Sequence, residues 1–296
     1  MADPRAAHGC RGRCVVMHSL AQYLARGILK RAARYLRSRP FVMRNPMPLV
    51  SFTFDDVPES AYMNGASILE QYDLRGTFYI AAGRGGTIDP DTHWPVIDRN
   101  QIRALCNRGH EIGCHTYSHA RVDYLDHRGM EEECRRNAEV LRELCPDIQL
   151  TNFCYPVGQV SLPRKLQLLK RFDSCRGCFE GINAGTVDLG LLSVIELYER
   201  KVTFGDLRHL IRATHDCNGW LILYTHDVAE PPSSIGCSPR LLRAAIEAAQ
   251  EAEMQCLTIR EALTAIGYSP AKGHADAAFG STSELHDFER SRDLME

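Results

Sequence analysis

Two adjacent carboxylates, Asp55 and Asp56, follow an apolar run in the stretch 49–60, which reads LVSFTFDDVPES. A β-branched and aromatic run that ends at a turn signal is typical of a buried strand. Neighbouring carboxylates repel each other, so a folded protein seldom places them at a strand end without a cation or a proton to relieve the repulsion. Taken alone, the pair also fits a surface turn.

A pair of histidines, His115 and His119, follows a second apolar segment at 111–114. On a helical turn, imidazoles four residues apart point to one side, so both can reach one ion. One Asp with two His, and with coordination positions left open, is the ligand set of a catalytic zinc-type site. The second Asp then remains free to act as a base on a water molecule at the metal, whose pKa the ion lowers towards ~7.

A third histidine, His226, follows the apolar run WLILYT at 220–225. In that position it predicts a proton donor for a leaving amine, and a hydrogen-bonded core histidine is the alternative. Cys175 and Cys178 form a CxxC pair, but no second CxxC accompanies them at zinc-site spacing. We therefore expect neither a structural zinc site nor a redox motif there.

The elements that must position these residues alternate between short apolar strands and amphipathic helices. Strands are expected at 49–54, 77–81, 111–115, 152–155, 194–197, 220–224 and 255–258, with a brief apolar segment at 172–175. This alternation predicts parallel strands joined by crossovers, in an open doubly wound sheet or a barrel. In either fold, chemistry collects at the C-terminal ends of the strands, where the polar residues named above fall.

Composition bounds the class of protein. The chain has 296 residues, with 44% hydrophobic and 24% charged residues and a formal net charge of −2, which describes a globular protein and argues against a generic nucleic-acid binder. No run of 18 apolar residues predicts a transmembrane span. Polar residues interrupt the apolar segment at 14–25, and no clear cleavage pattern follows it, so we expect no signal peptide.

The N-terminal part differs from the rest, because residues 1–45 hold ten Lys and Arg against one acid, Asp3. The stretch 17–38 has the pattern of a basic amphipathic helix. It either attaches to an anionic membrane surface or docks its apolar stripe on the main domain, and we favour docking. We divide the chain into a basic extension at 1–45, a main domain at 46–268 and a disordered tail at 269–296.

Twelve cysteines are present, most of them inside apolar runs, where Cys behaves as a small hydrophobe. A chain of this length does not need disulfides to fold. We therefore expect unpaired cysteines, a reducing compartment and a cytoplasmic location, at the inner membrane face if the basic helix binds lipid.

Four blocks of the sequence carry a family resemblance. TFDD at 53–56, HTYSH at 115–119, FCYPVG at 153–158 and LILYTHD at 221–227 resemble, in order, the motifs of the polysaccharide deacetylase family (NodB homology, carbohydrate esterase 4). The resemblance covers about residues 48–265 and implies an α/β fold, a distorted (β/α) barrel of about seven parallel strands. It implies that Asp55 is the general base, that Asp56, His115 and His119 hold the metal, and that His226 is the general acid.

The third block departs from the family pattern. The family often has an Arg there that orients the base, and Cys154 takes its place here. We hypothesise that Arg176, in the block SCRGCFEGIN, replaces it and pairs with Asp55. The resemblance implies an oxyanion donor at the backbone N–H of Val157. We assign Tyr155, Pro156, Val157 and Asn183 to the substrate side of the site.

These observations predict a metal-dependent hydrolase that removes an N-acetyl group from an amino sugar, in a polysaccharide, an oligosaccharide or a lipid-linked glycan precursor. The expected metal is Zn²⁺, with Co²⁺ or another transition metal as alternatives. SCRGCFEGIN and THDVAEPPSSIGCSP resemble a subgroup associated with exopolysaccharide and surface-glycan biosynthesis. The alternatives are a hydrolase of another non-peptide C–N bond, such as a formamide or a cyclic imide, and a non-catalytic glycan-binding module.

Overall fold

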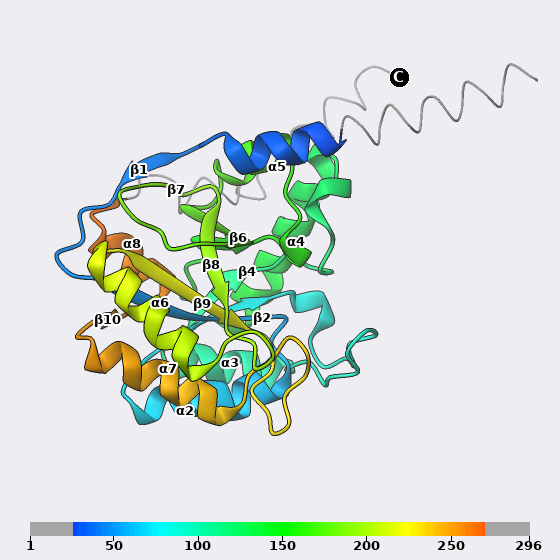
Figure 1. Ribbon diagram of the computed structural model, residues 1–296. Helices are drawn as coiled ribbons and strands as arrows, with labels where there is room; N and C mark the ends of the chain where they lie inside the picture. The colour runs from blue at the N-terminus through cyan, green and yellow to red at the C-terminus, as the bar shows by residue number, and fades with distance from the viewer. Residues whose placement is uncertain (1–25, 270–296) are drawn as a thin grey trace, which may run out of the picture.

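The computed structural model describes residues 26–269, and a closed barrel of seven parallel strands forms its core (Figure 1). The barrel strands are β2 (Leu49–Asp55), β3 (Thr77–Ile80), β4 (Glu111–Cys114), β5 (Asn152–Cys154), β6 (Ser174–Glu180), β8 (Leu192–Glu196) and β9 (Trp220–Thr225). β9 returns to pair with β2, from Leu49 opposite Trp220 to Phe54 opposite Thr225, which closes the ring. The predicted distorted (β/α) barrel is therefore confirmed.

Helices surround the strands, as parallel connections require (Figure 1). They are α2 (Ser67–Gln71), α3 (Arg99–Asn107), α4 (His127–Leu144), α5 (Leu162–Leu168), α6 (Phe204–Asp216), α7 (Pro239–Glu251) and α8 (Ile259–Ala265). α8 begins with a capping box, in which the Thr258 side chain accepts from the Glu261 N–H and the Glu261 side chain accepts from the Thr258 N–H. A short strand, β10 (Gln255–Cys256), pairs with the first residues of β2.

The layer between the strands and the surrounding helices is apolar, because the helices cover the outer face of the barrel and keep water away from it. Every residue of β2 is buried, and the rings of Phe54 and Phe78 stack at 4.6 Å. Burying side chains of this size stabilises the fold by about 2 kcal/mol each. Gly113 lies opposite Tyr79 in the register of β3 and β4, and a Cβ at Gly113 would be 2.4 Å from the Tyr79 ring. The glycine thus makes room for a tyrosine that faces the catalytic end of the barrel.

One pairing was not expected from the sequence. β1 (Pro40–Val42) and β7 (Thr186–Asp188) form a separate antiparallel pair that ties the N-terminal segment to the barrel. The buried Lys165 ammonium strengthens this attachment, since it donates to the carbonyls of Ala33 and Leu36 at the end of the first described helix. Part of the segment assigned to an extension therefore packs on the main domain.

The helix over residues 26–35 packs on the barrel through a face other than the apolar stripe that we expected to dock. Ile28 and Tyr35, on its apolar stripe, are 67% and 73% exposed. Lys30, on its basic face, forms an ion pair with Asp123 at 2.8 Å, and the Arg34 guanidinium lies 4.6 Å from the Phe179 ring. The prediction that the apolar stripe docks on the domain is wrong here, because the barrel offers this helix a carboxylate and an aromatic ring.

Other sequence predictions fall outside the described range, namely the start of the basic helix at 17–25 and the tail from 270 onward. Within residues 26–269, no helix has the length and apolar character needed to cross a membrane.

A disulfide joins Cys106 and Cys145, whose Cα atoms are 6.4 Å apart. It links the C-terminal ends of α3 and α4, so the expectation of unpaired cysteines is wrong for this pair. The sequence spacing did not reveal that two helix ends converge there.

Candidate metal centre and active site

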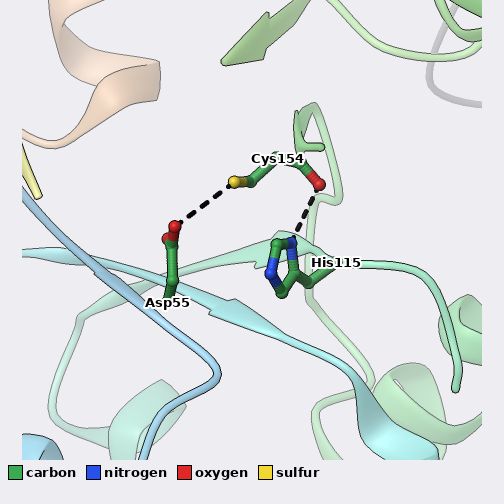
Figure 2. A group of neighbouring side chains, drawn as sticks. All are labelled: Asp55, His115 and Cys154. Carbon is green, nitrogen blue, oxygen red and sulfur yellow. Dashed lines mark hydrogen bonds between the residues drawn. The ribbon is translucent and has the colours of Figure 1, made fainter. Parts of the chain in front are cut away.

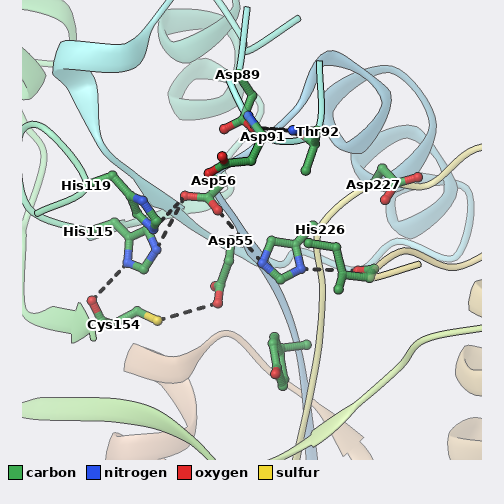
Figure 3. A network of polar contacts seen from close by, with 12 residues as sticks. Asp55, Asp56, Asp89, Asp91, Thr92, His115, His119, Cys154, His226 and Asp227 are labelled. Carbon is green, nitrogen blue, oxygen red and sulfur yellow. Dashed lines mark hydrogen bonds and ion pairs between the residues drawn. The ribbon is translucent and has the colours of Figure 1, made fainter. Parts of the chain in front are cut away.

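Asp56 and the two histidines come together at the C-terminal end of the barrel (Figure 3). The Asp56 Oδ1 atom lies 3.6 Å from His115 Nε2 and 3.2 Å from His119 Nε2. This oxygen is buried and accepts no hydrogen bond from any residue within 26–269. A buried carboxylate oxygen without a donor carries an unfavourable desolvation free energy, which a cation between these three groups would offset.

The donor spacing fits a metal ion. Two ligands at bonds of about 2.1 Å around a tetrahedral zinc ion are roughly 3.4 Å apart. The two carboxylate–imidazole separations, 3.2 and 3.6 Å, bracket that value. Two imidazole nitrogens and one carboxylate oxygen suit zinc and neighbouring transition metals.

His115 has the protonation state that a ligand needs (Figure 2). Its Nδ1–H donates to the Cys154 carbonyl at 2.9 Å, which leaves the Nε2 lone pair facing Asp56. Burial lowers the pKa of His115 to about 4, so the ring is neutral at neutral pH.

His119 reaches the site from a loop, which corrects the helical turn expected for residues 115–119. Thr116 and His119 both have positive φ values, 59° and 61°, and the segment between them is not helical. The Glu133 carboxylate of α4 fixes the loop by accepting from the N–H groups of Tyr117 and Ser118, at 2.9 and 2.8 Å. Loop geometry, rather than helical periodicity, therefore brings the two imidazoles together.

Asp55 ends β2 in a quite different setting. It is 3% exposed and forms an ion pair with the Arg176 guanidinium from β6. The Cys154 thiol donates to its Oδ2 atom at 3.5 Å (Figure 2). The structure thus brings Arg176 to the carboxylate that our sequence analysis paired it with, and adds the cysteine that stands in place of the usual arginine.

The charge of Asp55 is stabilised despite its burial. Burial alone would raise the pKa of Asp55, but the Arg176 guanidinium and the nearby His115 and His226 outweigh it, so the pKa is lowered. Burial raises the pKa of the Cys154 thiol well above its usual range, so the thiol remains a hydrogen-bond donor. Asp55 is therefore a carboxylate held ionised in an apolar pocket.

Two aromatic rings hold the guanidinium in place. Arg176 is 1% exposed and lies 4.6 Å from the ring centroid of Tyr79 and 5.1 Å from that of Tyr224. Cation–π contacts of this kind contribute about 2 kcal/mol when desolvated.

Among the described residues, two groups have a spacing suited to a metal ion: Asp56 with His115 and His119, and Asp55 with His115 and Cys154. The second group is the poorer site, because the Arg176 cation already neutralises Asp55 and would repel a second cation. Of the two groups, the one around Asp56 is therefore the better suited to a metal ion.

His226 faces Asp56 from the far side of the site (Figure 3). Its Nδ1–H donates to the Ile235 carbonyl at 3.1 Å, and its Nε2 lies 3.8 Å from Asp56 Oδ2. Nε2, the nitrogen that is left free to exchange a proton, therefore faces the site. The Asp227 carboxylate fixes the loop that carries Ile235, since it accepts from the Ser233 hydroxyl at 2.6 Å and its N–H at 2.8 Å.

The residues assigned to the substrate side are divided. Val157 is 60% exposed and lies in a short turn, η5 (Pro156–Gly158), with φ at 57°. Tyr155 points into the core instead, where its hydroxyl donates to the Gly190 carbonyl at 3.1 Å and its N–H donates to the Arg176 carbonyl at 3.0 Å. Its assignment to substrate contact is therefore corrected.

Asn183 is also misplaced in the sequence assignment. It pairs with Trp220, at the start of β9, whereas His226 follows the end of that strand. Its amide is used at that location, donating to the Ser193 carbonyl at 2.9 Å and accepting from the Ser193 N–H at 3.0 Å. The side chain has a structural role away from the catalytic end.

Lys30, which has no chemical role in the sequence predictions, connects two loops that follow site residues. The Lys30 ammonium lies 2.8 Å from Asp123, just beyond His119, and donates at 2.8 Å to Gln159, just beyond Val157. No sequence signal predicts this contact, since 129 residues separate Lys30 from Gln159.

An aromatic residue near the site was also missed. The Trp94 ring lies 6.1 Å from the His226 ring, with 35° between the two planes. Its one sequence signal is its place in a long Gly- and Asp-rich loop, because such loops carry binding residues more often than they carry core residues.

Comparison with known proteins finds a family match for part of the chain. Residues 43–173 match the family model described as polysaccharide deacetylase. Over 100 residues, the chain is 30% identical to a chitin deacetylase of Colletotrichum lindemuthianum, a match that spans 32% of this chain and 37% of the relative's length.

Solved structures share the fold. A protein from Mycobacterium smegmatis, described as a polysaccharide deacetylase, aligns with a TM-score of 0.55 at 16% identity, over 80% of this chain and 97% of its own. A family 4 acetyl xylan esterase from Clostridium thermocellum, in complex with a cobalt ion, aligns with a TM-score of 0.53 at 21% identity, over 75% and 93%. These similarities support the fold described above.

Proposed function

We propose that the protein is a metal-dependent hydrolase that removes the N-acetyl group from an amino sugar, and the match of residues 43–173 to the polysaccharide deacetylase family model supports this proposal. The reaction cleaves a linear amide C–N bond with water and releases acetate and an amine. The observation that carries the proposal is the contrast between Asp55, which is paired with Arg176, and Asp56, whose buried oxygen faces two imidazoles.

Asp55 acts as the general base, taking a proton from the attacking water. Arg176 and the Cys154 thiol keep this carboxylate ionised and aimed, so that it is ready to accept the proton. Asp56, His115 and His119 would hold the ion, which when bound polarises the amide carbonyl and lowers the pKa of the attacking water.

His226 acts as the general acid and gives a proton from Nε2 to the leaving nitrogen. The hydrogen bond from its Nδ1–H to Ile235 orients the ring for that transfer. The Val157 N–H is proposed as the donor that stabilises the developing oxyanion, because η5 places this residue beyond the end of β5 at an exposed position.

Zinc is the expected ion for two histidines and one carboxylate, and cobalt suits the same donors. The test is to remove metal with a chelator and add back Zn²⁺ or Co²⁺ while acetate release from N-acetylglucosamine oligosaccharides is followed. We expect activity to disappear and return. Activity that survives complete metal removal would exclude the proposal.

The same assay separates the alternatives. Parallel reactions with N-formyl and N-acetyl amino sugars distinguish a deacetylase from a hydrolase of other C–N bonds. A protein that binds these sugars without releasing either acid would be a glycan-binding module.

A lipid-linked glycan precursor is the proposed natural carrier of the sugar, as expected for an enzyme of exopolysaccharide or surface-glycan assembly. The outward face of the helix over 26–35 supports this choice. There Ile28 and Tyr35 are exposed, Leu36 just beyond is 54% exposed, and the exposed Arg31 and Arg37 flank them. Apolar side chains flanked by cations match the interface of an anionic membrane.

Vesicle co-sedimentation tests the membrane contact. The triple variant Ile28→Glu, Tyr35→Glu, Leu36→Glu is expected to lose binding to phosphatidylserine-containing vesicles. Met63→Glu is the control, since Met63 is 59% exposed on another part of the surface. Equal binding by both proteins would contradict the assignment.

A further inference from the structure

We propose that Lys30 is a positioning residue for the turn η5, whose Val157 N–H is the proposed oxyanion donor, an inference that rests on the proposed function. The Lys30 ammonium donates to the Gln159 side-chain oxygen at 2.8 Å, and Gln159 directly follows this turn. Lys30 lies on the helix over 26–35, which precedes the residues that match the family model. A segment outside that match thus contributes to the geometry of the site.

The backbone of η5 is unfavourable and needs to be held. Val157 has φ at 57° and ψ at 17°, in the left-handed region that β-branched residues rarely adopt. Such a conformation persists only where the surroundings fix it. The N–H groups of Gly158 and Gln159 donate to the carbonyls three residues earlier, at 2.9 and 3.2 Å, and close the turn on itself. The bond from Lys30 ties this turn to a separate element.

The Lys30 ammonium is itself fixed by a buried carboxylate. It lies 2.8 Å from Asp123, whose side chain is fully buried and also pairs with Arg121 at 3.1 Å. Burial alone would raise the pKa of Asp123, but the hydrogen bonds from Lys30 and Arg121 outweigh it, so the pKa is lowered. A charged acceptor on one side therefore holds the ammonium in place to donate to Gln159 on the other.

The helix that carries Lys30 contacts the barrel on both sides of this lysine. Arg26, Lys30 and Arg34 are four residues apart, so they lie along one side of the helix. The Arg26 guanidinium is 4.5 Å from the centroid of the Tyr124 ring, and that of Arg34 is 4.6 Å from the centroid of the Phe179 ring. These contacts reach the loop after β4 and the strand β6, while Lys30 reaches the segment after β5 between them. The helix is thus anchored at three adjacent strands.

Steady-state kinetics with N-acetylglucosamine oligosaccharides test the inference in Lys30→Met, which keeps the aliphatic stem and removes the charge. We expect kcat to fall about tenfold, because a small displacement of a catalytic group can cost as much as about 100-fold. KM and metal content should stay at the wild-type values, since an oxyanion donor acts only in the transition state. Lys30→Arg should retain most of the wild-type kcat, because a guanidinium can donate to the same two oxygens.

A double-mutant cycle shows whether Lys30 acts through the turn. Gln159→Met removes the acceptor at the other end of the bond and keeps the ion pair between Lys30 and Asp123. The two losses in kcat should overlap, so that the double variant is no slower than the slower single variant. Losses that multiply would overturn the inference. Lys170→Met, the same change at an exposed lysine, should keep the wild-type kcat. If Lys30→Met does not fold, Gln159→Met alone supplies the test.

Hydrogen exchange separates this inference from the proposed function, because it needs no substrate. The amides of Gly158 and Gln159 should exchange faster in Lys30→Met than in Lys170→Met, as measured by mass spectrometry. Faster exchange without acetate release by the wild-type enzyme would remove the proposed activity and retain Lys30 as the residue that holds the turn. Acetate release with the same kcat in wild type and Lys30→Met would retain the activity and overturn the inference, as would unchanged exchange.

Discussion

Asp55 and Asp56 are neighbours in the chain, and their surroundings are opposite. Asp55 is buried, paired with a guanidinium and bonded to a thiol, so its negative charge is already balanced. Asp56 turns away with φ at 57°, and one of its oxygens lies between imidazoles. The left-handed backbone conformation of Asp56 thus directs its carboxylate away from that of Asp55, so the two side chains have separate surroundings.

The different surroundings of Asp55 and Asp56 reduce the repulsion between the two adjacent carboxylates. Two like charges at a strand end would destabilise the fold if they shared one environment. Here the fold pairs Asp55 with a fixed cation, Arg176. The Asp56 carboxylate instead faces two imidazoles, where an exchangeable metal ion would balance its charge. Variants that change one environment at a time should therefore have different consequences.

The largest effect is expected from Asp56→Asn. Loss of the carboxylate removes one of three ligands, so metal content and acetate release should fall together to background. Metal analysis after gel filtration checks the first, and acetate assays check the second. A variant that retains stoichiometric zinc would end the assignment of Asp56 as a ligand.

Asp55→Asn, the isosteric change one residue earlier, should behave differently. We expect kcat to fall by about 10²–10⁴-fold while the metal content stays near that of the wild type, because a base is lost and no ligand is removed. The same two measurements apply. Loss of metal from this variant would contradict the division of roles.

Arg176→Met should destabilise the protein by about 3–5 kcal/mol in urea unfolding, because it leaves Asp55 buried without its partner. It should also lower kcat, and a near-normal kcat would exclude Arg176 as a positioning residue. In the double variant with Asp55→Asn, the two losses of stability should be less than additive. Additive losses would show that the two groups do not interact.

A buried histidine away from the metal provides a pH reference for this comparison. Burial lowers the pKa of His110 to about 4, while its Nδ1 accepts from the Gly76 N–H at 3.1 Å. The unfolded chain therefore binds more protons between about pH 6.5 and 4, so the stability from this group is present above 6.5 and is lost as the pH falls, by up to about 3 kcal/mol. His110→Gln should flatten this slope in urea unfolding, whereas exposed His127→Gln should not.

The smallest effect is expected from Cys154→Ala. It removes one weak hydrogen bond to Asp55 and leaves the ion pair intact, so stability should fall by about 1 kcal/mol and kcat by only a few fold. Unfolding and steady-state kinetics check this. A loss as large as that of Arg176→Met would mean that the thiol, rather than the guanidinium, holds the base.

The sequence predicted the features that depend on local pattern. The apolar runs ending at Asp55 and His226 became β2 and β9, and the sequence Thr258–Glu261 forms the capping box that starts α8. In each case the signal lies within a few residues, where strand and cap preferences act.

Features that depend on distant contacts were missed or misjudged. The helix over 26–35 buries Ala33 and contacts Asp123 and Phe179 through Lys30 and Arg34, and its own periodicity does not predict these contacts. The Cys106–Cys145 disulfide and the contact between the Trp94 and His226 rings likewise require segments far apart in the chain to meet. The pairing of Arg176 with Asp55 was predicted because a missing charge in one motif indicated a replacement elsewhere.

Lys30 connects an exposed helix to two loops that adjoin the candidate metal centre. One ammonium contacts the loop beyond His119 and the loop beyond Val157, and its helix presents Ile28 and Tyr35 outward. If a partner bound this helix and displaced Lys30, both loops would lose this contact. By thermodynamic reciprocity, if that displacement changed the affinity of the site for a metal ion, metal binding would change the affinity of the helix for the partner by the same factor.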